Sequence, residues 1–269
     1  MLLENMLDEI NQTVKNTLIM QDKKFGIAFS GGIDSTILSK ICENNLKNRF
    51  ILLTIGFPNS NDIEFAKKIA LQLDQIDHKI LEIDSKRFAV DLKFILENNH
   101  CNNISHIENC LAFYYISLLA KKNKLELVIT ANGFDELFCG YDIFRRIYDN
   151  GEEEIKNMID KKLKNEHILM NEINNITNKL DIQIKQPFLS KKFISFAKKI
   201  PIENKIKGND DYLRKHILRD LAVLINVPNE SSMRPKKALQ YGSQIHKNVL
   251  KVLVRNSEIK NILEKKKPH

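Results

Sequence analysis

Short apolar runs alternate with amphipathic segments along the first half of the chain. Four compact apolar runs predict buried strands, at residues 25–29, 50–55, 78–83 and 125–130. The segments between them place apolar residues at helical spacing, as Ile37, Leu38 and Ile41 do after the first run. Buried strands that alternate with helices are typical of a parallel sheet covered on both faces, so we expect an α/β fold.

The pattern changes near Gly151, where a run of acidic residues opens a long stretch of helical periodicity. Only residues 182–184 suggest a further strand there, and no linker rich in glycine, serine or proline separates the two halves. We therefore expect an α/β core over residues 1–149. Residues 150–269 are expected to form a mostly helical part that packs on this core and completes its site.

The first glycine loop, Ser30–Ser35 (SGGIDS), follows the first predicted strand and precedes a helix. Anions bind at this position of a parallel sheet, because the first N–H groups of the helix are unpaired. Gly31 and Gly32 let the backbone approach phosphate oxygens closely, and the serines add hydroxyl donors. A glycine turn that binds nothing is the alternative, but the complete string favours a phosphate-binding loop.

Asp34 is an acidic residue inside this loop, where it would repel phosphate unless a cation lay between the two. Mg²⁺ is commonly held by one or two carboxylates together with substrate phosphates, and it would resolve the conflict. The string GxxxxGK[ST] is absent, which disfavours a kinase or GTPase built on that motif. The sequence thus predicts a magnesium-bound nucleotide phosphate at the Ser30–Ser35 loop.

Ordered strings along most of the chain resemble the PP-loop ATP pyrophosphatase superfamily, and within it the synthetase domain of asparagine synthetases and β-lactam synthetases. The resemblance implies an adenine-nucleotide α-hydrolase-like core that binds ATP. It rests on SGGIDST at 30–36, Ile55-Gly56 followed by Asp62 and His78, ANGFDELFCGYDIFRR at 131–146, KQPFLS at 185–190, RKHILRD at 214–220 and RPKKALQYG at 234–242.

The resemblance also implies roles for individual residues. Asp34 and Asp135 would hold Mg²⁺ on the ATP phosphates, and Lys236, with Asp135 and Glu136, would form the catalytic set. A pair of acids at a helix start and plain surface charge are the alternatives for these three residues. The nucleotide would be received by Ala28, Ser30, Gly31, Gly32, Asp34, Ser35, Ile55, Thr130, Ala131 and Gly133.

The family chemistry is an adenylation. With the outer phosphates clasped, a carboxylate would attack the α-phosphate and expel pyrophosphate, and ammonia or another amine would then displace AMP. We accordingly expect an asparagine synthetase-like ligase, active in asparagine biosynthesis. The chain begins MLLENM without a glutaminase domain, which implies a stand-alone form that takes ammonia, another amine or nitrogen from a separate protein.

Four positions depart from the family pattern. Asn132 stands in place of a glutamate, Ser190 in place of an aspartate, Phe134 in place of a small residue and Cys139 in place of a glycine. The first three lie on the substrate side, so the identity of the acid and the amine stays open. For Cys139 we expect a packing role.

Composition bounds the remaining alternatives. The net charge of +8 comes from scattered basic residues, so we expect no nucleic-acid partner. A tRNA-modifying PP-loop adenylating enzyme and a catalytically altered ATP-binding subunit are the alternatives. No apolar stretch approaches the length of a membrane span, and the four cysteines form no CxxC pair, so a cytoplasmic enzyme with free thiols is expected. Metal binding at one further cluster is left open, at His100, Cys101, His106 and Cys110.

Overall fold

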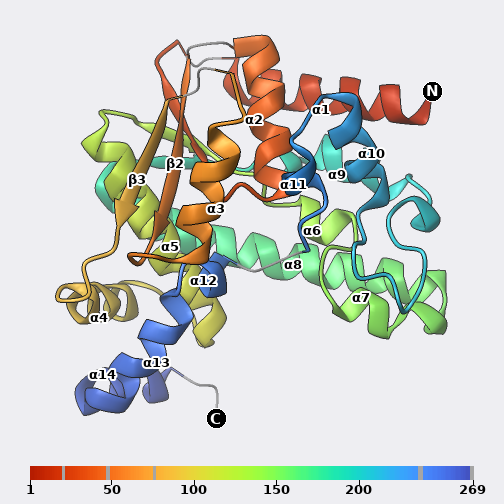
Figure 1. Ribbon diagram of the computed structural model, residues 1–269. Coiled ribbons are helices and arrows are strands. Elements are labelled where there is room, and N and C mark those ends of the chain that lie inside the picture. Colours follow the sequence, from red (N-terminus) through yellow and green to blue (C-terminus); the bar gives the residue numbers. More distant parts are fainter. Residues whose placement is uncertain (20–21, 47–48, 75–76, 236–238, 267–269) are drawn as a thin grey trace.

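The computed structural model describes residues 1–19, 22–46, 49–74, 77–235 and 239–266. Their centre is a parallel five-stranded sheet in the order β3-β2-β1-β4-β5, in which each strand pairs in parallel with its neighbours (Figure 1). The strands are β1 (Phe25–Ala28), β2 (Phe50–Gly56), β3 (His78–Glu82), β4 (Leu127–Ile129) and β5 (Gln183–Lys185).

The sheet confirms the α/β class that the hydrophobic pattern predicts. β2 is buried at every position, as expected for a strand covered on both faces. The four strands of the first half lie where the apolar runs predict them, with ends shifted by up to two residues. β5 falls one residue later than residues 182–184 and pairs with β4, so the sheet includes a strand from each half of the chain.

The strand order places a switch of direction between β1 and β4. From β1 the chain proceeds outward through β2 and β3, and it then returns to form β4 on the other side of β1. The loops that leave the carboxyl ends of such neighbouring strands diverge and open a crevice, which is where open parallel sheets bind ligands. The Ser30–Ser35 loop follows β1, and residues 130–133 follow β4. Both predicted binding segments therefore flank this crevice.

Helices cover both faces of the sheet. α2 and α3 connect β1 to β2 and β2 to β3 and lie against one face, whereas α5 crosses behind β2 and α8 lies beside β5 (Figure 1). The helices are α1 (Leu2–Leu18), α2 (Ile33–Leu46), α3 (Asn61–Ala70), α4 (Phe88–Asn98), α5 (Ile104–Lys122), α6 (Phe134–Leu137), α7 (Ile143–Arg146), α8 (Glu152–Thr177), α9 (Lys191–Lys198), α10 (His216–Leu224), α11 (Asn229–Ser232), α12 (Leu239–Gly242), α13 (Ile245–Arg255) and α14 (Ser257–Lys265).

A buried cluster of phenylalanines fixes the short helix α6 beneath the crevice. The ring of Phe134 stacks on that of Phe188 with 3.9 Å between centroids, and both rings contact Phe193. The preceding Gly133 has φ +110°, and a Cβ there would lie 2.9 Å from the carbonyl of Phe188. The departure at Phe134 therefore fills the core, and glycine at 133 permits the close approach of the two segments.

Cys139 is fully buried and has φ +57°, a left-handed conformation that favours glycine. The conformation accounts for the glycine that the family pattern has at this position. Burial raises the pKa of the Cys139 thiol to about 12, so the thiol stays protonated at neutral pH. These facts agree with the packing role expected for Cys139.

Candidate active site

A cavity of about 330 Å³ opens at the carboxyl ends of the central strands. Most of the residues that the sequence assigns to nucleotide and catalysis line it: Ala28, Ser30, Gly32, Asp34, Ser35, Ile55, Thr130, Ala131, Asp135 and Glu136. Gly31 and Gly133 shape the lining loops without being part of the wall. Lys236 lies outside the residues that the structure describes, so its role stays a prediction.

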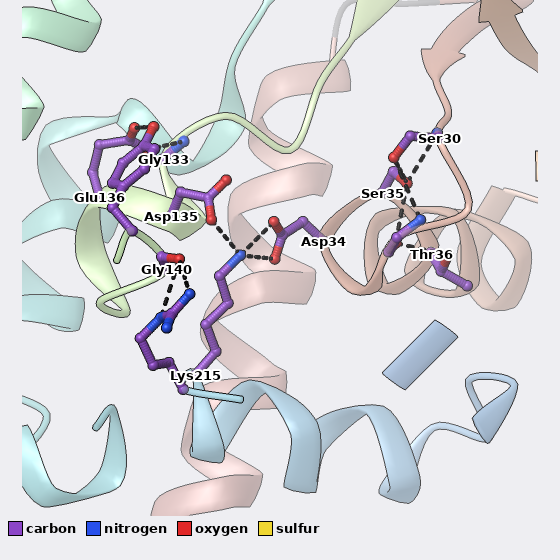
Figure 2. Close-up of polar contacts among 12 residues, drawn as sticks. Ser30, Asp34, Ser35, Thr36, Gly133, Asp135, Glu136, Gly140 and Lys215 are labelled. Atoms are coloured by element: carbon purple, nitrogen blue, oxygen red, sulfur yellow. Dashed lines mark hydrogen bonds and ion pairs between the residues drawn. The ribbon is translucent and has the colours of Figure 1, made fainter. Parts of the chain in front are cut away.

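The Ser30–Ser35 loop folds back on itself and is held by its own side chains (Figure 2). The backbone N–H of Ser30 donates to Ser35 Oγ at 3.3 Å, and Ser35 Oγ donates to the carbonyl of Gly32 at 3.1 Å. Gly31 has φ +72°, and a Cβ there would meet α3 at 3.0–3.2 Å. The loop is thus fixed by its own contacts at the start of α2, and the start of a helix is a place where anions commonly bind.

Asp34 and Asp135 come together across the cavity, as predicted for a shared cation, and the Lys215 ammonium lies between them (Figure 2). Lys215 Nζ is 2.8 Å and 2.6 Å from the two carboxylate oxygens of Asp34, and 2.6 Å from Asp135 Oδ1. The side chains of Asp34 and Asp135 are only 19% and 13% exposed. Both carboxylates are therefore partly shielded from solvent in the wall of the cavity.

The backbone at Lys215 is unusual. Arg214 and Lys215 have φ +48° and +56°, two successive left-handed residues with side chains, immediately before α10. Such residues are strained and persist only where the surroundings hold them. Arg214 donates through Nε and Nη2 to the carbonyl of Gly140, and Arg219 donates through Nε to the carbonyl of Arg214 at 2.7 Å. These bonds fix the position of the Lys215 ammonium.

At the other end of the cavity, Glu136 is buried and accepts a hydrogen bond from the Gly133 N–H at 3.1 Å, which caps α6. It also accepts a hydrogen bond from the Tyr141 hydroxyl. Burial first, and then the charges of Glu136, Asp135 and Glu166, raise the pKa of Tyr141 well above its usual value. Tyr141 therefore acts as a neutral hydrogen-bond donor in this acidic surrounding.

Asn132 joins a second carboxylate to this end of the cavity. Its amide oxygen accepts a hydrogen bond from Thr130 Oγ1 at 2.5 Å, and its Nδ2 donates to Glu166 Oε1 at 2.6 Å. Glu166 projects from α8, is 5% exposed and lines the cavity. An amide thus stands at position 132, where the family pattern has a carboxylate. This amide binds the Glu166 carboxylate of α8.

Arg234 connects the C-terminal segment to the phosphate loop. Its guanidinium donates to the carbonyl of Ser30 at 3.4 Å and to Asp62 Oδ1 at 3.2 Å, and it lies 3.9 Å from the centre of the Phe65 ring. Asp62 is 6% exposed at the start of α3, so the pair is largely shielded from solvent. This contact brings the chain immediately before Lys236 to the edge of the cavity.

His78 supports the floor of the cavity from β3. Thr54 Oγ1 donates to the carbonyl of Phe29 at 2.6 Å, so the bond between Thr54 Oγ1 and His78 Nε2, 2.8 Å long, has the imidazole as donor. Burial is the main cause that lowers the pKa of His78 to about 4. A neutral imidazole with its proton on Nε2 is therefore built into the fold.

Several residues of this site are not predictable from the sequence. Lys215 and Arg219 lie in the string RKHILRD, and Arg234 lies in RPKKALQYG, but these strings gave no chemical role for them. Tyr141 follows the predicted acid pair by a few residues and carried no signal of its own. Glu166 is one of several acids on α8, and its burial in the cavity wall and its contact with Asn132 appear only in the structure.

The cysteine and histidine cluster is separate from this polar network except at His106, which lines the cavity. Cys101 Sγ and Cys110 Sγ are buried and 3.9 Å apart. Across the described part of the chain, no group of three or more His, Cys, Asp or Glu residues is arranged to hold a metal ion. In the same part of the chain, no helix combines the length and apolar character that crossing a membrane requires.

Comparison with known proteins identifies the family. Residues 5–179 and 158–262 match the asparagine synthase family. The glutamine-hydrolyzing asparagine synthetase of Rattus norvegicus is 28% identical over 257 residues, which cover 88% of this chain and 45% of that protein. The glutamine-hydrolyzing asparagine synthetase B of Escherichia coli is 25% identical over 240 residues, which cover 81% of this chain and 42% of that protein. The chain spans about half the length of the curated relatives it matches.

Two solved structures were also similar. The NH3-dependent NAD synthetase of Campylobacter jejuni has a TM-score of 0.45 at 21% identity and covers 98% of this chain and 92% of its own. The U34-tRNA thiolase of Methanococcus maripaludis has a TM-score of 0.46 at 14% identity and covers 98% of this chain and 79% of its own. The sequence match along most of the chain decides the assignment: the chain belongs to the asparagine synthase family.

Proposed function

We propose that this protein is an ATP-dependent ligase that joins a carboxylate to ammonia or another amine, through an acyl-adenylate and with release of AMP and pyrophosphate. One observation carries the proposal. In a member of the asparagine synthase family, a preformed anion-binding loop and a cation-holding pair of carboxylates face the same cavity. This is the arrangement that a bound triphosphate requires.

The residues present fit a magnesium ion. The Lys215 ammonium is a stand-in cation, since it is held by carboxylate oxygens of Asp34 and Asp135 at 2.6–2.8 Å. Carboxylates are suitable ligands for Mg²⁺, and two of them beside a phosphate loop match its usual mode of binding. Magnesium held by Asp34 and Asp135 would neutralise charge on the pyrophosphate as it leaves. We propose Mg²⁺ as the metal on this basis.

The chain's own groups divide the work of the first step. The Ser30–Ser35 loop would hold the outer phosphates, and the walls at Ile55 and Ala131 would receive the adenosine. Lys215, and Lys236 in the role predicted for it, would place fixed positive charge beside the leaving pyrophosphate. The cavity would hold the α-phosphate and the acid together, which would give a proximity effect and limit access of water to the adenylate.

Glu166 is the group that we assign to the second step. Its carboxylate lines the cavity, where it accepts a hydrogen bond from Asn132 Nδ2. An ammonium ion must lose a proton before its nitrogen can attack, and an attacking neutral amine must lose one as AMP leaves; a carboxylate within hydrogen-bond reach can accept either proton. Glu136 is engaged by Gly133 and Tyr141, so we propose that it shapes this end of the cavity and supports Glu166 electrostatically.

Aspartate as the acid, a role in asparagine biosynthesis and a cytoplasmic location are the finer parts of the proposal. The relatives named above are described as glutamine-hydrolyzing. For this chain we propose free ammonia or a separate nitrogen-donating protein as the source of nitrogen.

The experiment is an ATP–pyrophosphate exchange assay over a panel of amino acids and other carboxylates. The proposal predicts exchange that depends on one class of acid, and formation of AMP and amide in equal amounts when ammonia is added. An Asp34→Asn variant serves as the inactive control. Binding of ATP without exchange for any acid would refute the ligase proposal.

A further inference from the structure

The two carboxylates of the proposed metal site are both in contact with one positively charged side chain. Asp34 and Asp135 approach each other closely enough to share one ammonium, with contacts of 2.6–2.8 Å to Lys215 Nζ. Lys215 is 2% exposed, so the three charges interact where solvent screens them little. Two carboxylates this close repel each other strongly unless a cation compensates them.

The chain places the ammonium there at a conformational cost. Lys215 and Arg214 both adopt left-handed backbone conformations, and hydrogen bonds from Arg219 and to Gly140 hold them. At Gly140, a Cβ would lie 2.0 Å from Asp135 Oδ1 and 2.4 Å from Lys215 Cε, so this position must be glycine for the contact to form. Strain of this kind points to a functional constraint.

From this arrangement we propose that the Lys215 ammonium is the resident counter-ion of Asp34 and Asp135 and competes with a divalent metal ion for them. The ammonium of Lys215 would leave the two carboxylates when a metal binds them, and it would then be available to phosphates in the same cavity. Lys215 thus keeps the carboxylate pair assembled before the metal binds. The identity of that incoming metal and nucleotide rests on the proposed function, whereas the competition itself is between Lys215 and a cation for Asp34 and Asp135.

A permanent salt bridge is the alternative, in which Lys215 keeps its contacts and a metal binds beside it. The two cases differ in a measurable way. If the ammonium competes, its removal must strengthen metal binding, because the cation that contacts both carboxylates in the wild type is then gone. If it does not compete, its removal takes away contacts without benefit to the metal.

The test measures binding of Mn²⁺ alone, by electron paramagnetic resonance of the free ion, with no nucleotide or acid present. The variants are Lys215→Met and, as a matched control, Lys40→Met. Lys40 is also nearly buried and paired with a carboxylate, that of Glu43 on the same helix, outside the cavity. Competition predicts that Lys215→Met binds Mn²⁺ at least about 10-fold more tightly than the wild type, the effect expected of removing a like charge, and that Lys40→Met does not.

A third variant, Asp34→Asn with Lys215→Met, localises the effect. It should lose the gain in affinity; a gain that persists in it would place the ion elsewhere and overturn the proposal. Unchanged or weaker Mn²⁺ binding by Lys215→Met would also overturn it. If Lys215→Met is unfolded in sodium buffer, circular dichroism decides: folding on addition of Mn²⁺ supports the counter-ion role, and failure to fold with Mn²⁺ refutes it. The Mn²⁺ binding measurement gives a result whether or not the protein has ligase activity.

Discussion

Gly140 offers a sharp perturbation of the site, because its missing side chain makes room for two charged groups. A Cβ at this position would lie 2.0 Å from Asp135 Oδ1, 2.4 Å from Lys215 Cε and 2.9 Å from the Asp135 Cα. Contacts under about 3 Å do not occur between such atoms, and the third contact is to backbone. Gly140→Ala must therefore displace Asp135 or Lys215 by roughly 1 Å, a shift that can lower catalysis by about 10²-fold.

The stability of the same variant should change less than its activity. Insertion of one methyl group into a packed site typically costs about 1–3 kcal/mol. We expect urea unfolding to show a loss in this range, while kcat for acid-dependent pyrophosphate release falls by about 10²-fold. A loss of kcat that is much larger than the loss of stability would show that the variant displaces the groups that act in catalysis.

Gly208→Ala is the matched control, since the atom nearest to its added Cβ is 3.9 Å away. Its stability should stay within about 0.5 kcal/mol of the wild type and its kcat within a factor of about two. The reasoning is refuted if Gly140→Ala keeps wild-type kcat and stability, or if both glycine variants lose activity to the same extent.

Three further predictions concern other parts of the site. Glu166→Gln should lower amide formation by about 10²-fold or more while acid-dependent ATP–pyrophosphate exchange changes only a few-fold; equal loss of both would remove Glu166 from the second step. The exposed neighbour His167 provides the control, as His167→Gln. Asp135→Asn should lower exchange by about 10²-fold or more, and normal exchange would contradict its metal role. The pKa of His78 is lowered to about 4 from a usual 6.5, so the unfolded state takes up the proton first as pH falls from 6.5 to 4. The free energy of unfolding should decline over that window by on the order of 2 kcal/mol more in the wild type than in His78→Gln, and parallel pH profiles in urea unfolding would contradict this.

The strands and the phosphate loop were predictable from the sequence because their causes are local. Buried strands appear as apolar runs, and the Ser30–Ser35 loop gathers glycine, hydroxyl and acid in six consecutive residues. β5 was harder to locate, because it is only three residues long and lies at the sheet edge among helices. The division at residue 150 stays a prediction, although β5 shows that the sheet extends past it.

The charges around the cavity were less predictable, because long-range packing decides which of many similar residues meet. Lys215 and Asp34 are 181 residues apart, and the left-handed backbone that brings them together carries no glycine signal. Glu166 and Asn132 are brought together by the packing of α8 on α6, which periodicity alone does not specify. The resemblance indicated the strings that contain Lys215 and Arg234, whereas the structure supplied their contacts.

In the proposed first step, a carboxylate attacks the α-phosphate of a nucleotide bound at the Ser30–Ser35 loop. An oxygen-transfer experiment tests it most directly, with the acid that supports exchange labelled with ¹⁸O in its carboxyl group and the products analysed by mass spectrometry. The account predicts one labelled oxygen in AMP and none in pyrophosphate. Label in inorganic phosphate with formation of ADP, or amide formed without label in AMP, would contradict it.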